Sequence, residues 1–145
     1  MKRLAVAGLS VALVAATVVL ANDTTHVTKA ACNGQPDYKC TPGVVDTSIT
    51  KADLCPHLGP RVVRSVSAAT KTTVRNEYGV KNFHGEIDHL ISLELGGSND
   101  IKNLWPQPGS IPNAKDVVEN QLHKQVCAGQ ITLSQAQIQI VHWKG

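Results

Sequence analysis

The sequence predicts a small α+β domain in which two short strands and one helix lie inside a mostly helical, disulfide-linked shell. Residues 86–95 carry an apolar run typical of an extended segment, and residues 114–127 carry apolar side chains at helical spacing. Four cysteines suggest disulfide links. The length of 145 residues suits a single domain once the N-terminus is set aside.

Residues 1–21 are predicted to be a signal peptide. Lys2 and Arg3 form a short basic start, a continuous apolar stretch follows, and Ala21 ends it with a small side chain. Cleavage before Asn22 would deliver the chain to the periplasm or the exterior, with no stable membrane association. The alternative is an uncleaved anchor, because the stretch is just long enough to be a candidate span.

The charge of the mature chain is close to neutral. The loss of residues 1–21 leaves 124 residues, with 12 basic side chains against 11 acidic ones and a net charge of about +1. Bulk charge is therefore excluded as the source of attraction to nucleic acid. A local basic patch or a bound metal ion would have to supply that attraction.

The cysteines are even in number and follow an export signal, which predicts two disulfides. Of the three possible pairings, we expect Cys32–Cys40 as a local link and Cys55–Cys127 as a long closure between the N-terminal half and a late helix. The alternative is a zinc site on these thiolates. It is disfavoured because no C-x-x-C pair occurs and the spacings are irregular.

The first part of the mature chain is expected to be irregular. Residues 22–43 are rich in turn-forming side chains and form an N-terminal leader, so the folded domain is placed at residues 44–145. A short helix is predicted after Thr50, whose side chain can cap residues 51–53. Pro56 ends it.

The middle of the chain is predicted to contain one helix and two strands. The helix covers residues 67–78 and ends at Gly79. The apolar run of residues 86–95 is the first strand, closed by a Gly-Gly turn. Residues 102–105 form the second strand, which Pro106 ends.

Two helices are predicted to complete the domain. The stronger covers residues 114–127, with Asp116 in its first turn, where the helix dipole favours a carboxylate. Its apolar stripe comprises Val117, Val118, Leu122 and Val126. The last helix covers residues 134–143, with Ser134 and Gln137 at capping-box spacing. The central order is therefore strand, loop, strand, helix.

The adjacent pair Asp88 and His89 is the strongest candidate for chemistry. Phosphodiester hydrolysis needs an activated water, a charge sink and help for the departing oxygen. A neutral histidine can activate the water, and a carboxylate can hold a divalent ion that supplies the rest. Successive side chains of a strand point to opposite faces. The two residues can therefore act on one phosphate only if the strand ends or bends there.

The sequence D-H-L-I-S-L-E-L-G-G at residues 88–97, followed by N-L-W-P-Q-P at residues 103–108, resembles the HNH endonuclease family, in particular its small secreted bacterial members. The resemblance extends over residues 41–143. It implies a ββα-metal finger at about residues 85–128, with two antiparallel strands and a helix around one divalent ion. Mg²⁺ is expected, and Mn²⁺ or another divalent ion is the alternative.

The resemblance also implies roles for individual residues. Asp88 corresponds to the first metal ligand, His89 to the general base, and Asn103 to the middle asparagine that fixes the loop and orients the base. Asn113 stands in place of the family's last histidine and is the expected further metal ligand. His123 is the alternative ligand.

Four residues are expected to support this site. Glu86 would hydrogen-bond a metal-bound water or a histidine. Lys115 would contact a substrate phosphate, and Asp116 and Glu119 would hold the loop. The alternative reading of the last two is an acidic helix start with a solvated face. Backbone phosphate contacts are considered for Arg61, Arg64, Arg75, Lys81 and Lys102.

The expected function is that of an exported, metal-dependent endonuclease. Its partner would be nucleic acid, with DNA first, at low sequence specificity because no base-reading module is evident. It is expected to be a monomer, and a toxin role would require an immunity protein. The alternatives are an HNH scaffold that binds metal or nucleic acid without cutting, and a structural secreted domain held by disulfides.

Overall fold

The computed structural model describes Pro36 and residues 40–143. The predicted signal peptide, and the predicted leader apart from Pro36 and residues 40–43, lie outside the described residues. Among the helices that are described, none has the length and apolar character needed to cross a membrane.

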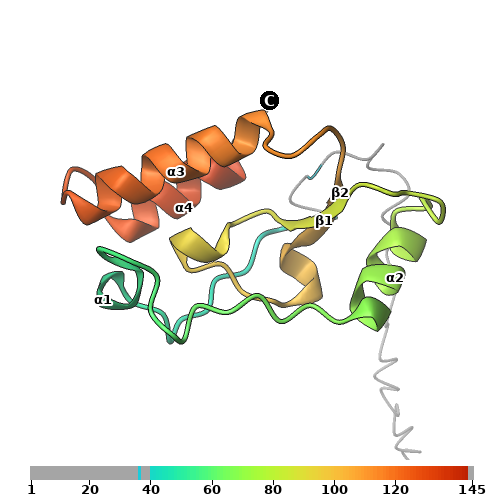
Figure 1. The fold of residues 1–145 in the computed structure, drawn as a ribbon, viewed down its shortest axis with the longest axis horizontal. Coiled ribbons are helices and arrows are strands. Elements are labelled where there is room, and N and C mark those ends of the chain that lie inside the picture. Colours follow the sequence, from blue (N-terminus) through green and yellow to red (C-terminus); the bar gives the residue numbers. More distant parts are fainter. Residues whose placement is uncertain (1–35, 37–39, 144–145) are drawn as a thin grey trace, which may run out of the picture.

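The fold combines helices with one small antiparallel sheet, so the predicted α+β class is confirmed. Helices α3 and α4 lie side by side on one flank, α2 lies on the other, and the sheet lies between them (Figure 1). In chain order the elements are α1 (Lys51–Leu54), α2 (Ala68–Glu77), β1 (Glu86–His89), the 3₁₀ turns Leu93–Leu95 and Ile101–Asn103, β2 (Leu104–Gln107), α3 (Ala114–Cys127) and α4 (Leu133–Val141).

The first two helices begin and end where their capping residues predict. Thr50 and Asp53 form a capping box at the start of α1. The Ser67 hydroxyl accepts a hydrogen bond from Thr70 N at the start of α2. That helix ends at Glu77 with Tyr78 as its C-cap, and Gly79 follows with a φ of 69°, which suits a residue without a Cβ.

The first predicted strand is wrong beyond His89. β1 ends there, and the apolar residues that follow turn into a loop containing the 3₁₀ turn Leu93–Leu95. The Asn103 amide replaces a partner strand, since it accepts from Ile91 N (3.0 Å) and donates to Ile91 O (3.0 Å). Gly97 completes the turn where a Cβ would collide with Ile91 O.

The second predicted strand is shifted along the chain. Residues expected to open it form the 3₁₀ turn, and β2 continues through Pro106 to Gln107. The hydrogen bond from Leu90 N to Asn103 O (2.7 Å) sets the alternation of the ladder. By that alternation Pro106 pairs with Ile87 at a position without ladder bonds, where a missing N–H costs little.

Helix α3 has the predicted bounds but a different buried face. Leu122 and Val126 are buried as expected, whereas Val117 is 65% exposed. Lys115 and Glu119 take the remaining places on the buried face. The prediction for Val117 was wrong because the first half of α3 packs through charged side chains rather than apolar ones.

Helix α4 begins earlier than predicted. Thr132 is its N-cap and forms the capping box with Gln135, so the pairing of Ser134 with Gln137 was wrong. The Gln137 side chain instead donates to Leu95 O (2.9 Å), which attaches α4 to the loop after β1.

Two buried apolar clusters meet at β1 and the loop that follows it. One lies between the sheet and α2 and contains Cys40, Val74, Tyr78, Ile87, Leu90, Leu104 and Trp105. The other lies between α3, α4 and the loop and contains Ile91, Leu95, Leu122, Val126, Ala136 and Ile140. The end of β1 is therefore held from both sides.

The predicted Cys55–Cys127 disulfide is present, with a Cα–Cα distance of 5.5 Å. It links the end of α1 to the end of α3. Cys40 is also disulfide-bonded. Its predicted partner, Cys32, lies outside the described residues.

Candidate active site

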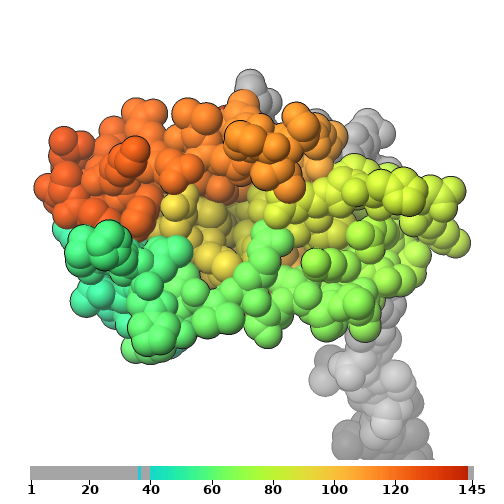
Figure 2. Space-filling view, viewed as in Figure 1, coloured from blue at the N-terminus to red at the C-terminus, as the bar shows by residue number. Residues whose placement is uncertain are grey.

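A pocket of about 340 Å³ opens where β1 ends. Figure 2 shows this hollow between α3 and the segment that joins α1 to α2, with residues of β1 and its following loop at the floor. Most of its lining residues are polar or charged: Arg64, Glu86, Asp88, His89, Ser92, Leu93, Glu94, Ile111, Asp116 and Glu119. A larger groove on the outer face of α3 contains only one ionisable group, Lys124, which gives it little catalytic potential.

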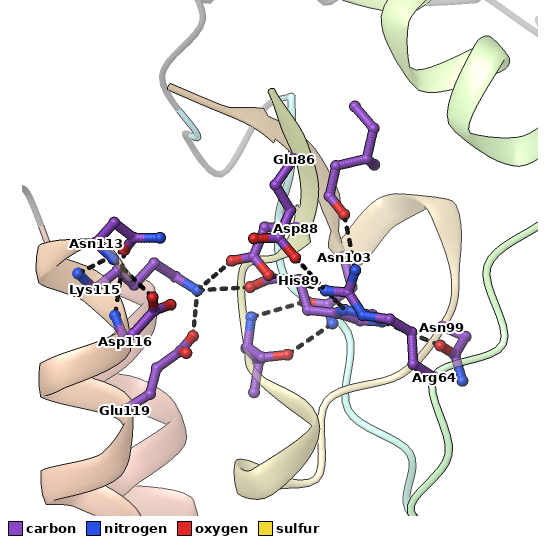
Figure 3. A network of polar contacts seen from close by, with 12 residues as sticks. Arg64, Glu86, Asp88, His89, Asn99, Asn103, Asn113, Lys115, Asp116 and Glu119 are labelled. Atoms are coloured by element: carbon purple, nitrogen blue, oxygen red, sulfur yellow. Dashed lines mark hydrogen bonds and ion pairs between the residues drawn. The ribbon is translucent and has the colours of Figure 1, made fainter. Parts of the chain in front are cut away.

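Asp88 and His89 are the last two residues of β1, and both line the pocket. This is the strand end that the sequence requires if adjacent side chains are to face one site. Asp88 is 9% exposed and His89 is 1% exposed. Figure 3 shows the charged side chains that surround them.

Lys115 projects from the first turn of α3 and is fully buried. Its ammonium donates to Asp88 Oδ2 (2.9 Å) and to His89 O (2.7 Å), and it pairs with Glu119. These three acceptors satisfy the ammonium, which is the condition for burying it. Lys115 therefore faces the protein interior, in contrast to the predicted contact with a substrate phosphate.

Arg64 reaches the other side of Asp88 from the segment between α1 and α2. Its Nη2 lies 3.2 Å from Asp88 Oδ1, 3.1 Å from Glu86 Oε1 and 3.3 Å from His89 Nδ1. The side chain is 38% exposed, so it can leave these partners for solvent or a ligand. The two oxygens of Asp88 are thus each paired with a different cation.

His89 is held as a neutral imidazole. Burial lowers its pKa below the ordinary value, and the nearby Arg64 charge lowers it further, while the Asn99 hydrogen bond raises it. The net pKa is lowered, so the ring carries no proton on its second nitrogen near pH 7. A neutral imidazole of this kind can accept a proton from water.

Asn103 fixes the loop, as predicted, but it does not touch the His89 ring. Its amide bonds Ile91 on both sides and also donates to Ser98 O (2.9 Å). The ring is contacted instead by Asn99, whose Oδ1 lies 3.1 Å from His89 Nε2. Asn99 was missed because it lies in a turn-rich segment where asparagine is common.

The pocket holds more negative than positive charge. Its five carboxylates face two cations, Arg64 and Lys115, which leaves a formal excess of three negative charges. Burial raises the pKa of Glu86 and of Glu94, and it raises the pKa of Glu119 to about 7. Glu94 was not predicted, although it stands within the Leu-Glu-Leu-Gly-Gly run.

The donors of this pocket are of the chemical type that a hard divalent cation takes, although among the described residues no three of them have ligand atoms within 4.8 Å of one another, so the side chains would have to draw together around an ion. Carboxylate oxygens of Asp88, Glu86, Glu94 and Glu119 are the ligand type that Mg²⁺ and Mn²⁺ prefer. Ser92 also lines the pocket, and within the described part of the chain its buried Oγ has no hydrogen-bond partner.

The structure does not bring Asn113 to this pocket. Its Oδ1 caps α3 by accepting from Lys115 N (2.9 Å) and Asp116 N (3.3 Å), and Figure 3 shows it at the helix start, apart from Asp88. Asp116 bonds Asn113 N (2.7 Å) in return. Helix capping therefore accounts for the positions of the Asn113 and Asp116 side chains without a metal.

His123 lies behind the pocket rather than in it. Its Nε2 is 3.0 Å from Leu54 O and 3.4 Å from Cys127 Sγ, and its Nδ1 is 3.9 Å from Glu94 Oε2. It forms a possible metal-binding group with Cys55 and Cys127. Those two sulfurs are joined in the disulfide, so they are not thiolate ligands.

No protein-family model, curated protein or solved structure matches this chain significantly.

Proposed function

We propose that this protein is an exported, metal-dependent endonuclease of the HNH type. The observation that carries the proposal is the buried imidazole of His89 beside an excess of carboxylates in one pocket. The sequence resemblance adds to it. The order β1, β2, α3, with Lys115 of α3 bonded to Asp88 of β1, is compatible with a ββα-metal finger.

The proposed metal is one divalent ion, Mg²⁺ or Mn²⁺, on Asp88 with oxygens from Glu86, Glu94 or Glu119. When bound, such an ion supplies charge stabilisation for the phosphate and help for the leaving oxygen. These carboxylates replace Asn113 in our assignment, because Asn113 is occupied as a helix cap.

The chain's own residues would perform the proton transfer. His89 accepts a proton from the attacking water, and its burial keeps it neutral and ready near pH 7. Arg64, partly exposed at the rim, is free to move from Asp88 to the substrate phosphate. Because these groups recognise the phosphodiester backbone rather than bases, we expect weak sequence preference.

Export is the second half of the proposal. The Cys55–Cys127 disulfide is compatible with an oxidising compartment, which is where a cleaved signal peptide would deliver the chain. A nuclease acting there would meet nucleic acid outside the cytoplasm.

The test is a digestion of plasmid DNA and of RNA, side by side, by the purified mature chain with added Mg²⁺ or Mn²⁺. We expect metal-dependent cutting that His89→Ala reduces by at least about 100-fold. His84→Ala is the matched control, because His84 is exposed and outside the pocket. Equal cutting by His89→Ala and the parent would refute the proposal. Metal binding without any cutting would favour the non-catalytic scaffold.

A further inference from the structure

Asn99 holds two parts of the pocket together through one amide group. Its Nδ2 donates to Val63 O (2.9 Å), and its Oδ1 accepts from Ser65 N (2.9 Å). A backbone carbonyl can only accept and a backbone N–H can only donate. The two bonds therefore fix which end of the Asn99 amide is oxygen, and that oxygen lies 3.1 Å from His89 Nε2.

The fixed amide determines the tautomer of His89. An amide oxygen cannot donate, so His89 Nε2 must carry the ring hydrogen, and in the neutral ring the lone pair is then on Nδ1. An independent contact agrees, because Arg64 Nη2 lies 3.3 Å from Nδ1 and a guanidinium can only donate.

The Nδ1 lone pair points toward Arg64, which lines the pocket. The same Arg64 nitrogen that approaches His89 Nδ1 also bonds Asp88 Oδ1 (3.2 Å). Nδ1 and the proposed metal-binding carboxylate thus share one neighbour. Figure 3 shows Asn99 on the side of His89 away from Lys115 and Glu119.

We propose that Asn99 is the positioning residue of the general base. It selects the Nε2–H tautomer of His89 and thereby presents the Nδ1 lone pair to the water in the pocket. The inference rests on the proposed function, in which His89 is that base. Because Val63 and Ser65 flank Arg64, the same amide also places Arg64 opposite Nδ1.

The experiment combines ring ¹⁵N NMR of histidine-labelled protein at pH 8 with cleavage kinetics. The parent should show a protonated Nε2 on His89. Asn99→Leu should lose that single tautomer and lower kcat by roughly 10–100-fold. Asn99→Asp keeps the acceptor toward His89 Nε2 but sets a carboxylate oxygen against Val63 O and a negative charge beside the ring, so it should retain the Nε2–H of His89. Asn82→Leu, at an exposed asparagine, is the control.

Three results would overturn the inference: an Nδ1–H tautomer in the parent, an unchanged tautomer in Asn99→Leu, or an unchanged kcat in that variant. The NMR of the parent decides the tautomer whether or not Asn99→Leu folds. A parent that cuts no nucleic acid would instead refute the proposed function, and the NMR result would still decide the structural half of the inference. The two failures are therefore distinguishable.

Discussion

The ammonium of Lys115 lies 2.9 Å from Asp88 Oδ2, inside the protein and fully shielded from solvent. A charge in this position is tolerated because Glu119 and His89 O accept its other hydrogens. The start of α3 is thus joined to the end of β1 by an ion pair, while the rest of α3 is held by apolar packing.

Lys115→Met should destabilise the fold by about 3–5 kcal/mol, because it leaves two buried carboxylates without their shared cation. Chemical denaturation at pH 7 measures the loss. Lys124→Met is the control on the same helix, since Lys124 is exposed, and it should change the stability by less than about 0.5 kcal/mol. A Lys115→Met variant as stable as the parent would show that the buried ion pair contributes no net stability.

Glu119 should make the stability of the fold depend on pH. Its pKa is raised from 4.5 to about 7, mainly by burial, so the folded state binds a proton that the unfolded state releases. The free energy of unfolding therefore falls as the pH rises through this window, by at most about 3 kcal/mol from this group. His89, with its lowered pKa, acts in the opposite direction.

The comparison of the parent with Glu119→Gln isolates the effect, because the variant cannot titrate there. Denaturant melts at pH 5, 6, 7 and 8 should show the variant gaining stability relative to the parent as the pH rises. A difference that stays constant across this range would mean that Glu119 is ionised throughout.

Local sequence signals predicted the helices well. Thr50 and Ser67 stand at the predicted helix starts and are capping residues, whereas Asn113, predicted as a metal ligand, caps α3. The buried face of α3 was mispredicted because Lys115 and Glu119 read as surface residues. Only their proximity to Asp88, 27 residues before Lys115, shows that they are buried.

The candidate site was predicted only in part, because some of its residues come together only in the folded chain. The neighbours Asp88 and His89 are visible as a pair, but Arg64 and Asn99 meet them only through the folded chain, at separations of 24 and 10 residues. The segment that carries Arg64 has no periodic pattern. Its place across the pocket depends on tertiary contacts such as the bonds from Asn99.

The Cys55–Cys127 disulfide should contribute roughly 4 kcal/mol to stability, because it closes a loop between residues 72 apart in sequence. The double variant Cys55→Ser, Cys127→Ser should unfold at correspondingly lower denaturant concentration. A reductant also opens the Cys40 disulfide, so the reduced parent is compared with the double variant under the same reductant, and these two midpoints should agree. Since neither sulfur lines the pocket, metal affinity of the folded variant should match that of the parent. A large loss of affinity would show that the link shapes the site.

Arg64 should compete with a divalent metal for the same oxygens. Its guanidinium bonds Asp88 Oδ1 and Glu86 Oε1, and these contacts must break before a cation can take their place. Because the side chain is 38% exposed, they are worth about 1 kcal/mol. Arg64→Gln should therefore bind Mn²⁺ roughly five- to tenfold more tightly than the parent in calorimetric titrations. Arg61→Gln removes the same charge from the same segment outside the pocket and should leave the affinity nearly unchanged. Equal affinities in the two variants would show that Arg64 and the metal do not share ligands.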